Sequence, residues 1–120
     1  MFTAVASSTA SELFPYKLFH LGGDEVSYSC WDSSPEVTAW QSEMGYDDEA
    51  TYHYFVNTTA ALTNKYGRSP VQWVEVFEHF EASLNPSTIV HVWKAKESLD
   101  DVLLAGFNAL LSDEDLWYLE

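Results

Sequence analysis

Positive charge is scarce in this sequence. Five Lys and Arg residues stand against 19 Asp and Glu residues, which gives a formal net charge of −14. Coulomb repulsion therefore opposes binding to nucleic acid or to an anionic membrane surface, and we expect neither as a partner.

Cysteine occurs once, so an internal disulfide is excluded. The residues alone leave two interpretations of Cys30 open: a small buried hydrophobic side chain, or half of a disulfide bridge to a cysteine outside this chain.

Metal-ligand spacing is missing too. His20 and Asp24 are close together, but no second histidine stands at ligand spacing, so we expect no metal site.

Long apolar runs are also missing, because no stretch approaches the roughly 20 apolar residues of a membrane span. The first 14 residues lack the basic segment of a signal peptide, and Glu12 interrupts them.

What the chain does have is 120 residues, 47% of them hydrophobic and 16% aromatic. This composition is typical of one small globular domain with a packed core.

Helical and strand patterns alternate along the chain. The expected helices cover 2–13, 32–45, 47–67 and 96–106, and the expected strands cover 16–21, 70–77, 87–93 and 107–112. Because the strands are near-continuous apolar runs, we predict an α/β fold with a parallel sheet covered by helices. A closed (β/α)₈ barrel needs about 200 residues or more, so this chain can hold only a partial one.

The stretch HLGGDEV (20–26) places two glycines and two adjacent carboxylates after an expected strand. The carboxyl ends of parallel strands are where ligands and catalytic groups gather. A carboxyl group that donates a proton near neutral pH needs a raised pKa, which a neighbouring anion provides. We therefore predict a catalytic pair at Asp24 and Glu25, with the glycines turning the backbone so that both reach one cavity. The alternative is an acidic loop in which Asp24 caps a helix.

Aromatic residues recur at the ends of the later strands. Trp73 and Trp93 each lie near the end of an expected strand, and Trp117 and Tyr118 follow the last one. Aromatic faces beside a carboxylate pair suit a sugar, whose C–H groups pack on rings while its hydroxyls seek polar partners. Each Trp taken singly fits a core position as well.

Four blocks of the sequence together resemble the catalytic domain of glycoside hydrolase family 20, the β-N-acetylhexosaminidases. They are HLGGDEVSYSCW (20–31), VQWVEVF (71–77), TIVHVW (88–93) and GFNALLS…WYLE (106–120), in family order and at family spacing. The resemblance is strongest to the eukaryotic lysosomal and secreted members. It implies a TIM barrel, of which residues 1–120 would form a partial catalytic domain supplying about strands four to seven.

The resemblance also implies an activity. It is the hydrolysis of terminal N-acetylglucosamine or N-acetylgalactosamine residues of glycans, without a cofactor, in a lysosomal or secreted enzyme that is often a dimer in relatives. The mechanism it implies is substrate-assisted and retaining. Glu25 would protonate the leaving oxygen and then activate water. Asp24 would orient the 2-acetamido group and stabilise the oxazolinium-like intermediate.

The same resemblance assigns further residues. Trp73 and Trp93 would wall the acetamido pocket, and the Tyr118 hydroxyl would bond the acetamido oxygen. Glu120 falls where relatives carry a shorter Asp or Asn that touches the sugar. Cys30 matches a disulfide cysteine whose partner lies upstream of Met1.

Parts of the family's pattern are absent from this chain, including the substrate-binding arginine of the first strand. We therefore expect a segment of a longer enzyme. The 120 residues alone would be inactive and prone to associate through open strand edges. A non-catalytic carbohydrate-binding or interaction module that kept Trp73, Trp93 and Tyr118 is the alternative. It would have no need of a proton donor at Glu25.

Overall fold

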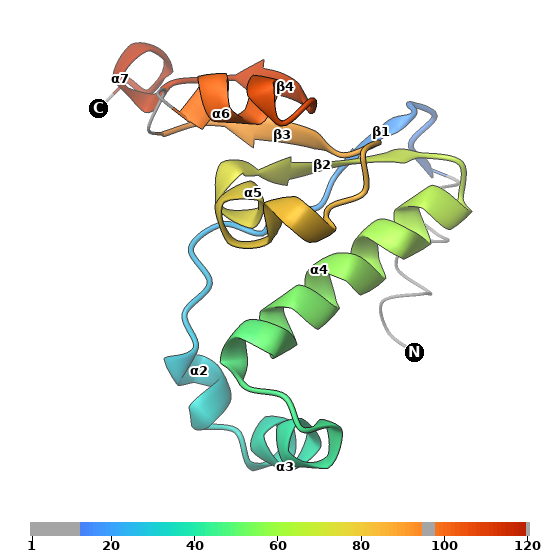
Figure 1. Cartoon of the computed structure of the whole chain (residues 1–120), viewed down its shortest axis with the longest axis vertical. Helices are drawn as coiled ribbons and strands as arrows, with labels where there is room; N and C mark the ends of the chain where they lie inside the picture. The colour runs from blue at the N-terminus through green and yellow to red at the C-terminus, as the bar shows by residue number, and fades with distance from the viewer. Residues whose placement is uncertain (1–12, 95–97, 120) are drawn as a thin grey trace.

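A parallel four-stranded sheet organises the computed structural model, which describes residues 13–94 and 98–119 (Figure 1). The strands are β1 (Leu18–His20), β2 (Ser69–Trp73), β3 (Ile89–Val92) and β4 (Asn108–Leu111), and they lie side by side in chain order. The register places His20 opposite Val71, and Trp73 opposite His91. The predicted α/β fold with a parallel sheet is therefore confirmed.

Helices fill the connections between the strands. The described helices are α2 (Ser29–Asp32), α3 (Pro35–Met44), α4 (Asp48–Lys65), α5 (Val74–Phe80), the 3₁₀ turn η1 (Glu81–Ser83), α6 (Ser98–Leu104) and α7 (Glu114–Trp117). Figure 1 shows α4 running past the sheet next to α5, while α2 and α3 lie at the far end of α4, away from the strands. The expected helix at 2–13 lies outside the described residues apart from Leu13. The short helices α2 and α7 were not predicted.

The ends of α3 and α4 follow from local chemistry. The Ser34 side chain accepts a hydrogen bond from the Val37 backbone N–H, and Gly45 ends α3 in the left-handed conformation at φ 67°. The Asp47 side chain caps α4 by accepting from the Ala50 backbone N–H at 2.8 Å. These side chains satisfy backbone N–H groups that a helix start leaves without partners. Both predicted helices are confirmed.

The hydrophobic core lies between the sheet and the helices packed on it. Its fully buried members include Val56 of α4, Val74 and Val76 of α5, and Val90 and Val92 of β3. No helix among the described residues is both long and apolar enough to cross a membrane.

The strand expected at 70–77 is wrong in its second half. Pairing with β3 ends at Trp73, and Val74 begins helix α5. The β-branched and aromatic residues of 74–77 favoured a strand, but in the helix Val74, Val76 and Phe77 are all buried in the core. Burial against the sheet outweighs an intrinsic strand preference that spans only about 1 kcal/mol per residue.

The buried face of α4 does not follow its larger apolar residues. Tyr52, Phe55, Leu62 and Tyr66 recur at helical spacing within 47–67. Tyr52 is buried, but Phe55 is 56% exposed and Tyr66 is 39% exposed. The buried residues are instead Thr51, Tyr52, Val56, Thr59, Ala60 and Thr63. Threonines can take this face because Thr59 and Thr63 donate their hydroxyls to backbone carbonyls one turn earlier.

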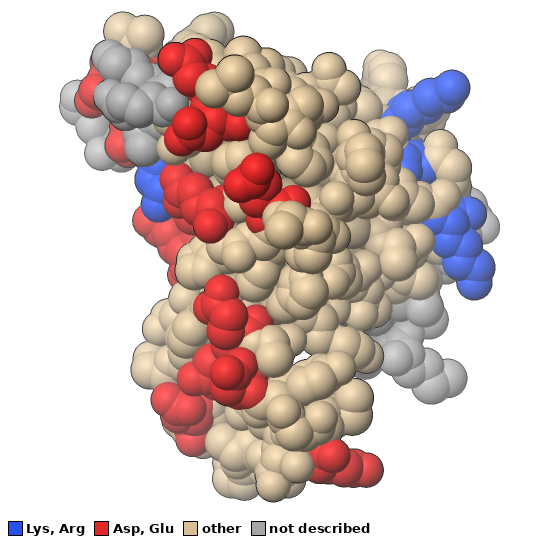
Figure 2. All heavy atoms as spheres, viewed as in Figure 1, with Lys and Arg blue, Asp and Glu red and all other residues tan. Residues whose placement is uncertain are grey.

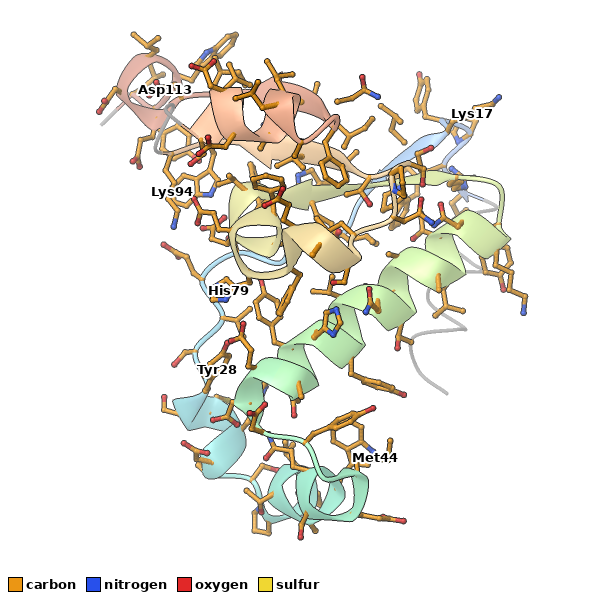
Figure 3. All side chains as sticks on the ribbon, in the orientation of Figure 1. Lys17, Tyr28, Met44, His79, Lys94 and Asp113 are labelled. Atoms are coloured by element: carbon orange, nitrogen blue, oxygen red, sulfur yellow. The ribbon has the colours of Figure 1, made fainter. Side chains whose placement is uncertain are left out.

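Charge is divided between the two ends of the sheet. Figure 2 shows acidic side chains gathered along one side of the molecule and most of the visible basic side chains on the opposite side. Lys17 immediately precedes β1, whereas Lys94 follows β3, and Figure 3 shows the two on opposite sides of the molecule. Acidic side chains thus surround the carboxyl ends of the strands and form an acidic rim. Lys94 is a basic residue at this same edge.

Candidate active site

The loop after β1 has an unusual backbone. Sheet pairing continues past β1, because Leu21 N–H donates to Val71 O at 2.8 Å and Trp73 N–H donates to Gly22 O at 3.1 Å. The chain then turns through positive φ angles at Gly22 (74°), Gly23 (100°) and Glu25 (46°). Residues with side chains rarely adopt such angles, so the two glycines are what allow this turn. The glycines thus turn the backbone as expected, whereas the shared cavity for Asp24 and Glu25 stays a prediction.

Packing adds a second reason for Gly23. A Cβ atom at this position would lie 2.4 Å from Val76 Cγ2 of α5. The Gly23 carbonyl accepts a hydrogen bond from the hydroxyl of Tyr52, which is buried on α4. Burial raises the pKa of Tyr52, with the charges of Glu75 and Asp24 among the further contributions, so the hydroxyl stays protonated and donates. The loop is thereby held against both α4 and α5.

Asp24 and Glu25 follow at the carboxyl edge of the sheet, and both are exposed. Their charges still act on the residues around them. Asp24 opposes the lowering of the His20 pKa, and Glu25 contributes to the raised pKa of Lys94. The two carboxylates therefore lie within electrostatic range of groups from different strands.

The predicted aromatic residues come together in one row at this edge. Trp73 ends β2, Trp93 follows β3 and Tyr118 follows α7. The ring centroids of Trp73 and Trp93 are 6.2 Å apart in an edge-on arrangement, and those of Trp93 and Tyr118 are 6.2 Å apart and stacked. The structure thus joins three of the six predicted site residues by ring contacts. Glu120 lies outside the described residues.

Two histidines that sequence reasoning assigned to no shared site contact the Trp73 end of this row. His20 Nε2 and His91 Nδ1 are 3.1 Å apart, and His91 Nε2 is 2.8 Å from Ser112 Oγ. The Trp73 ring contacts both imidazoles, with centroid distances of 4.6 Å to His20 and 4.2 Å to His91. Burial lowers the pKa of both histidines, and in His20 the neighbouring His91 lowers it further.

Glu75 was also missed. It lies in the first turn of α5 and is 7% exposed, and its carboxylate accepts from Trp93 Nε1 and pairs with Lys94 Nζ at 2.8 Å. The hydrogen bond to Glu75 is the largest cause of the raised pKa of Lys94. The sequence did offer a signal for Glu75, which is the only charged residue in the apolar run VEVF (74–77). A carboxylate buried in such a run needs a polar partner.

Hydrogen bonds among Tyr28, Glu49 and His79 connect the segment that follows Asp24 and Glu25 to α4 and α5. The Tyr28 hydroxyl donates to Glu49 Oε2 at 2.7 Å, and His79 Nδ1 lies 3.0 Å from Glu49 Oε1. Burial and the hydrogen bond to Glu49 raise the pKa of Tyr28 to about 12. Figure 3 shows Tyr28 and His79 on the same side of the molecule. This group anchors the chain that leaves Asp24 and Glu25.

Cys30 is exposed with a free thiol, so the interpretation as a buried hydrophobic residue is wrong. The bridge to a cysteine outside the chain stays a prediction. Among the described residues, no three His, Cys, Asp or Glu side chains lie together in a way that could hold a metal ion.

Comparison with known proteins gives one consistent family. Residues 2–120 match the family model described as "Glycosyl hydrolase family 20, catalytic domain". Among curated proteins, Beta-hexosaminidase 3 of Arabidopsis thaliana is 32% identical over 113 residues, which cover 94% of this chain and 21% of that protein. Beta-hexosaminidase subunit alpha of Bos taurus is 36% identical over 117 residues, covering 91% of this chain and 22% of that protein. The chain thus spans about a fifth of the length of these relatives.

The fold has solved counterparts as well. The chain superposes with a TM-score of 0.77 on a GH20 exo-β-N-acetylglucosaminidase from Vibrio harveyi, crystallised in complex with N-acetylglucosamine. The match covers 92% of this chain and 17% of that one, at 24% identity, and shows a shared fold. A crystal structure described as a beta-N-acetylhexosaminidase matches with a TM-score of 0.75 over 95% of this chain and 24% of its own, at 25% identity.

Proposed function

Since this chain belongs to glycosyl hydrolase family 20, we propose that the full-length protein is a β-N-acetylhexosaminidase. It removes terminal N-acetylglucosamine or N-acetylgalactosamine residues from the non-reducing ends of glycans. The four strands are part of a TIM barrel, in which β1 to β4 correspond to about strands four to seven. The compartment proposed with this activity is the lysosome or the outside of the cell, and the proposed assembly is a dimer.

One observation carries the proposal. A carboxylate pair and a row of three aromatic rings, contributed by two strand ends and by the residue that follows α7, gather at the same edge of a parallel sheet. The row consists of Trp73, Trp93 and Tyr118, and its rings contact one another in sequence. This is the edge at which α/β barrels bind substrates, and a sugar ring needs both apolar faces and polar partners.

The proposed reaction divides the work between the two carboxylates. Glu25 donates its proton to the glycosidic oxygen as the bond to the anomeric carbon breaks. The carbonyl oxygen of the substrate's own 2-acetamido group attacks that carbon, so the intermediate is a cyclic oxazolinium and needs no protein nucleophile. Glu25, now ionised, takes a proton from the water that opens the ring.

Asp24 serves the internal nucleophile. It orients the acetamido N–H and stabilises the positive charge that develops on the ring nitrogen. Trp73 and Trp93 enclose the acetamido group, the Tyr118 hydroxyl donates to its oxygen, and Glu120 reaches a sugar hydroxyl. The acidic rim suits a cationic intermediate, because negative charge near it lowers its energy.

The test is turnover of an aryl N-acetyl-β-glucosaminide by the full-length protein. Glu25→Gln keeps the size of the side chain and removes the proton donor, and we expect kcat to fall about a thousandfold. Glu43→Gln is the matched control, because Glu43 is an exposed residue of α3, and it should leave kcat unchanged. Hydrolysis that survives in Glu25→Gln would contradict the assignment. Saturable tryptophan quenching by N-acetylglucosamine without hydrolysis would favour a carbohydrate-binding module instead.

A further inference from the structure

Glu75 is a buried carboxylate for which the proposed reaction has no use. It lies in the first turn of α5 between Val74 and Val76, which are both fully buried, and is itself 7% exposed. Removing an ionised carboxylate from water is costly unless other groups replace the lost hydration. The groups that contact the Glu75 carboxylate therefore indicate its role.

Those partners are two consecutive residues at the edge of the sheet. Trp93 Nε1 lies 3.2 Å from Oε1 and 3.1 Å from Oε2 of Glu75, so the indole N–H is shared by both oxygens. Lys94 Nζ lies 2.8 Å from Glu75 Oε1 and 5.2 Å from the centroid of the Trp93 ring. The carboxylate thus holds the indole at its edge, and the ammonium that it pairs with lies over the indole's face.

Trp93 is also the middle ring of the aromatic row. It contacts Trp73 edge-on and stacks with Tyr118, so the geometry of both contacts depends on the plane of its ring. An indole has one N–H donor, and a charged acceptor on that donor fixes the rotation of the ring about its side-chain bonds. A change in that rotation would alter two ring contacts at once.

We propose that Glu75 is a positioning residue, which fixes the plane of Trp93 and so shapes the pocket that receives the acetamido group of the sugar. This inference rests on the proposed function of the aromatic row. It assigns Glu75 a role in substrate binding without contact with the substrate. The hydrogen bond to the indole is the part that matters, and the ion pair with Lys94 holds the carboxylate in place.

The experiment measures the affinity of the full-length protein for N-acetylglucosamine by tryptophan fluorescence, together with KM for the aryl substrate. Glu75→Met keeps the length of the side chain but offers the indole no strong acceptor, and we expect Kd and KM to rise about tenfold, as for one lost charged hydrogen bond. Glu75→Gln keeps an acceptor oxygen, and Kd should stay within about threefold of wild type. Glu78→Met, on an exposed residue of the same helix, should change neither value.

A double-mutant cycle separates positioning from a general loss of structure. Trp93→Phe removes the indole N–H, so Glu75→Met should raise Kd less than about twofold in that background. An equal loss of affinity with and without the indole would overturn the proposal. So would a folded Glu75→Gln whose Kd rises tenfold, and that variant decides the matter even where Glu75→Met does not fold.

The failure of this inference is distinguishable from the failure of the proposed function. A wild-type protein that hydrolyses the substrate, with Glu75→Met of equal Kd and KM, overturns the role of Glu75 alone. A wild-type protein that neither binds N-acetylglucosamine nor hydrolyses the substrate overturns both.

Discussion

Gly23 and Val76 lie so close together that a Cβ atom on the glycine would come within 2.4 Å of Val76 Cγ2. Gly23 belongs to the loop that carries Asp24 and Glu25, and Val76 is a fully buried residue of α5. The same helix presents Glu75 to Trp93. One short helix, α5, therefore packs against the loop that carries the two carboxylates and also holds Trp93 of the aromatic row.

This contact makes Gly23→Ala damaging for two reasons. The new methyl group would displace Val76, and the φ of 100° is strained for alanine. We expect the free energy of unfolding to fall by at least about 2 kcal/mol. Gly67→Ala is the matched control, because Gly67 has a positive φ of 70° with no atom within 4 Å of its added Cβ. Urea unfolding of the two variants checks this, and equal losses would contradict the packing argument.

The hydrogen bond from Tyr52 to the Gly23 carbonyl gives a second prediction. Tyr52→Phe leaves that carbonyl without its donor, so we expect a loss of about 1 kcal/mol in stability and a several-fold fall in kcat/KM. Tyr54→Phe, on the exposed side of the same helix, should change stability by less than about 0.5 kcal/mol. If Tyr52→Phe matched wild type in both measurements, the carbonyl would not need this donor.

Asp24→Asn separates binding from rate. The proposed contact of Asp24 with the acetamido group strengthens as positive charge develops, so we expect kcat to fall about a hundredfold or more. KM should change less than about threefold, because the substrate in its ground state carries no such charge. Steady-state kinetics on the aryl substrate, with Asp32→Asn as an exposed control on α2, provide the measurement. An unchanged kcat would remove Asp24 from the mechanism.

The paired histidines predict a dependence of stability on pH. Burial lowers the pKa of His20 and of His91 below the ordinary 6.5, and the neighbouring His91 adds to the effect on His20 while Asp24 opposes it. The unfolded chain therefore binds more protons than the folded one as pH falls below about 6.5, so stability is present above that pH and declines below it.

Replacing one of the pair should flatten this decline. We expect the unfolding midpoint of His91→Gln to change less between pH 7 and pH 5 than that of wild type, whatever its value at pH 7. His53→Gln, on α4, controls for the loss of a histidine elsewhere. Parallel pH profiles for wild type and His91→Gln would show that the pair does not control stability in this range.

Much of the fold was predictable because its signals are local. Ser34, Gly45 and Asp47 set helix ends through contacts within a few residues of themselves, and the end of α3 and the start of α4 lie within one residue of the expected bounds. The parallel sheet followed from apolar strands alternating with helices, a pattern visible along the chain. The position of Asp24 and Glu25 after a strand was predictable from the same alternation of strands and helices.

Tertiary packing decided the rest. VEVF reads as a strand by its residue types, yet it forms a helix because the sheet and α4 offer a surface on which Val76 and Phe77 are buried. His20 and His91 are 71 residues apart in sequence, and only the strand register brings them together around Trp73. Glu75 and Trp93 meet because α5 packs on the sheet beside β3.

The sequence by itself thus determined which chemical groups stand at the strand ends, since that depends on neighbours along the chain. The tertiary structure alone decided which of those groups touch, because contacts between distant segments depend on how the helices pack on the sheet.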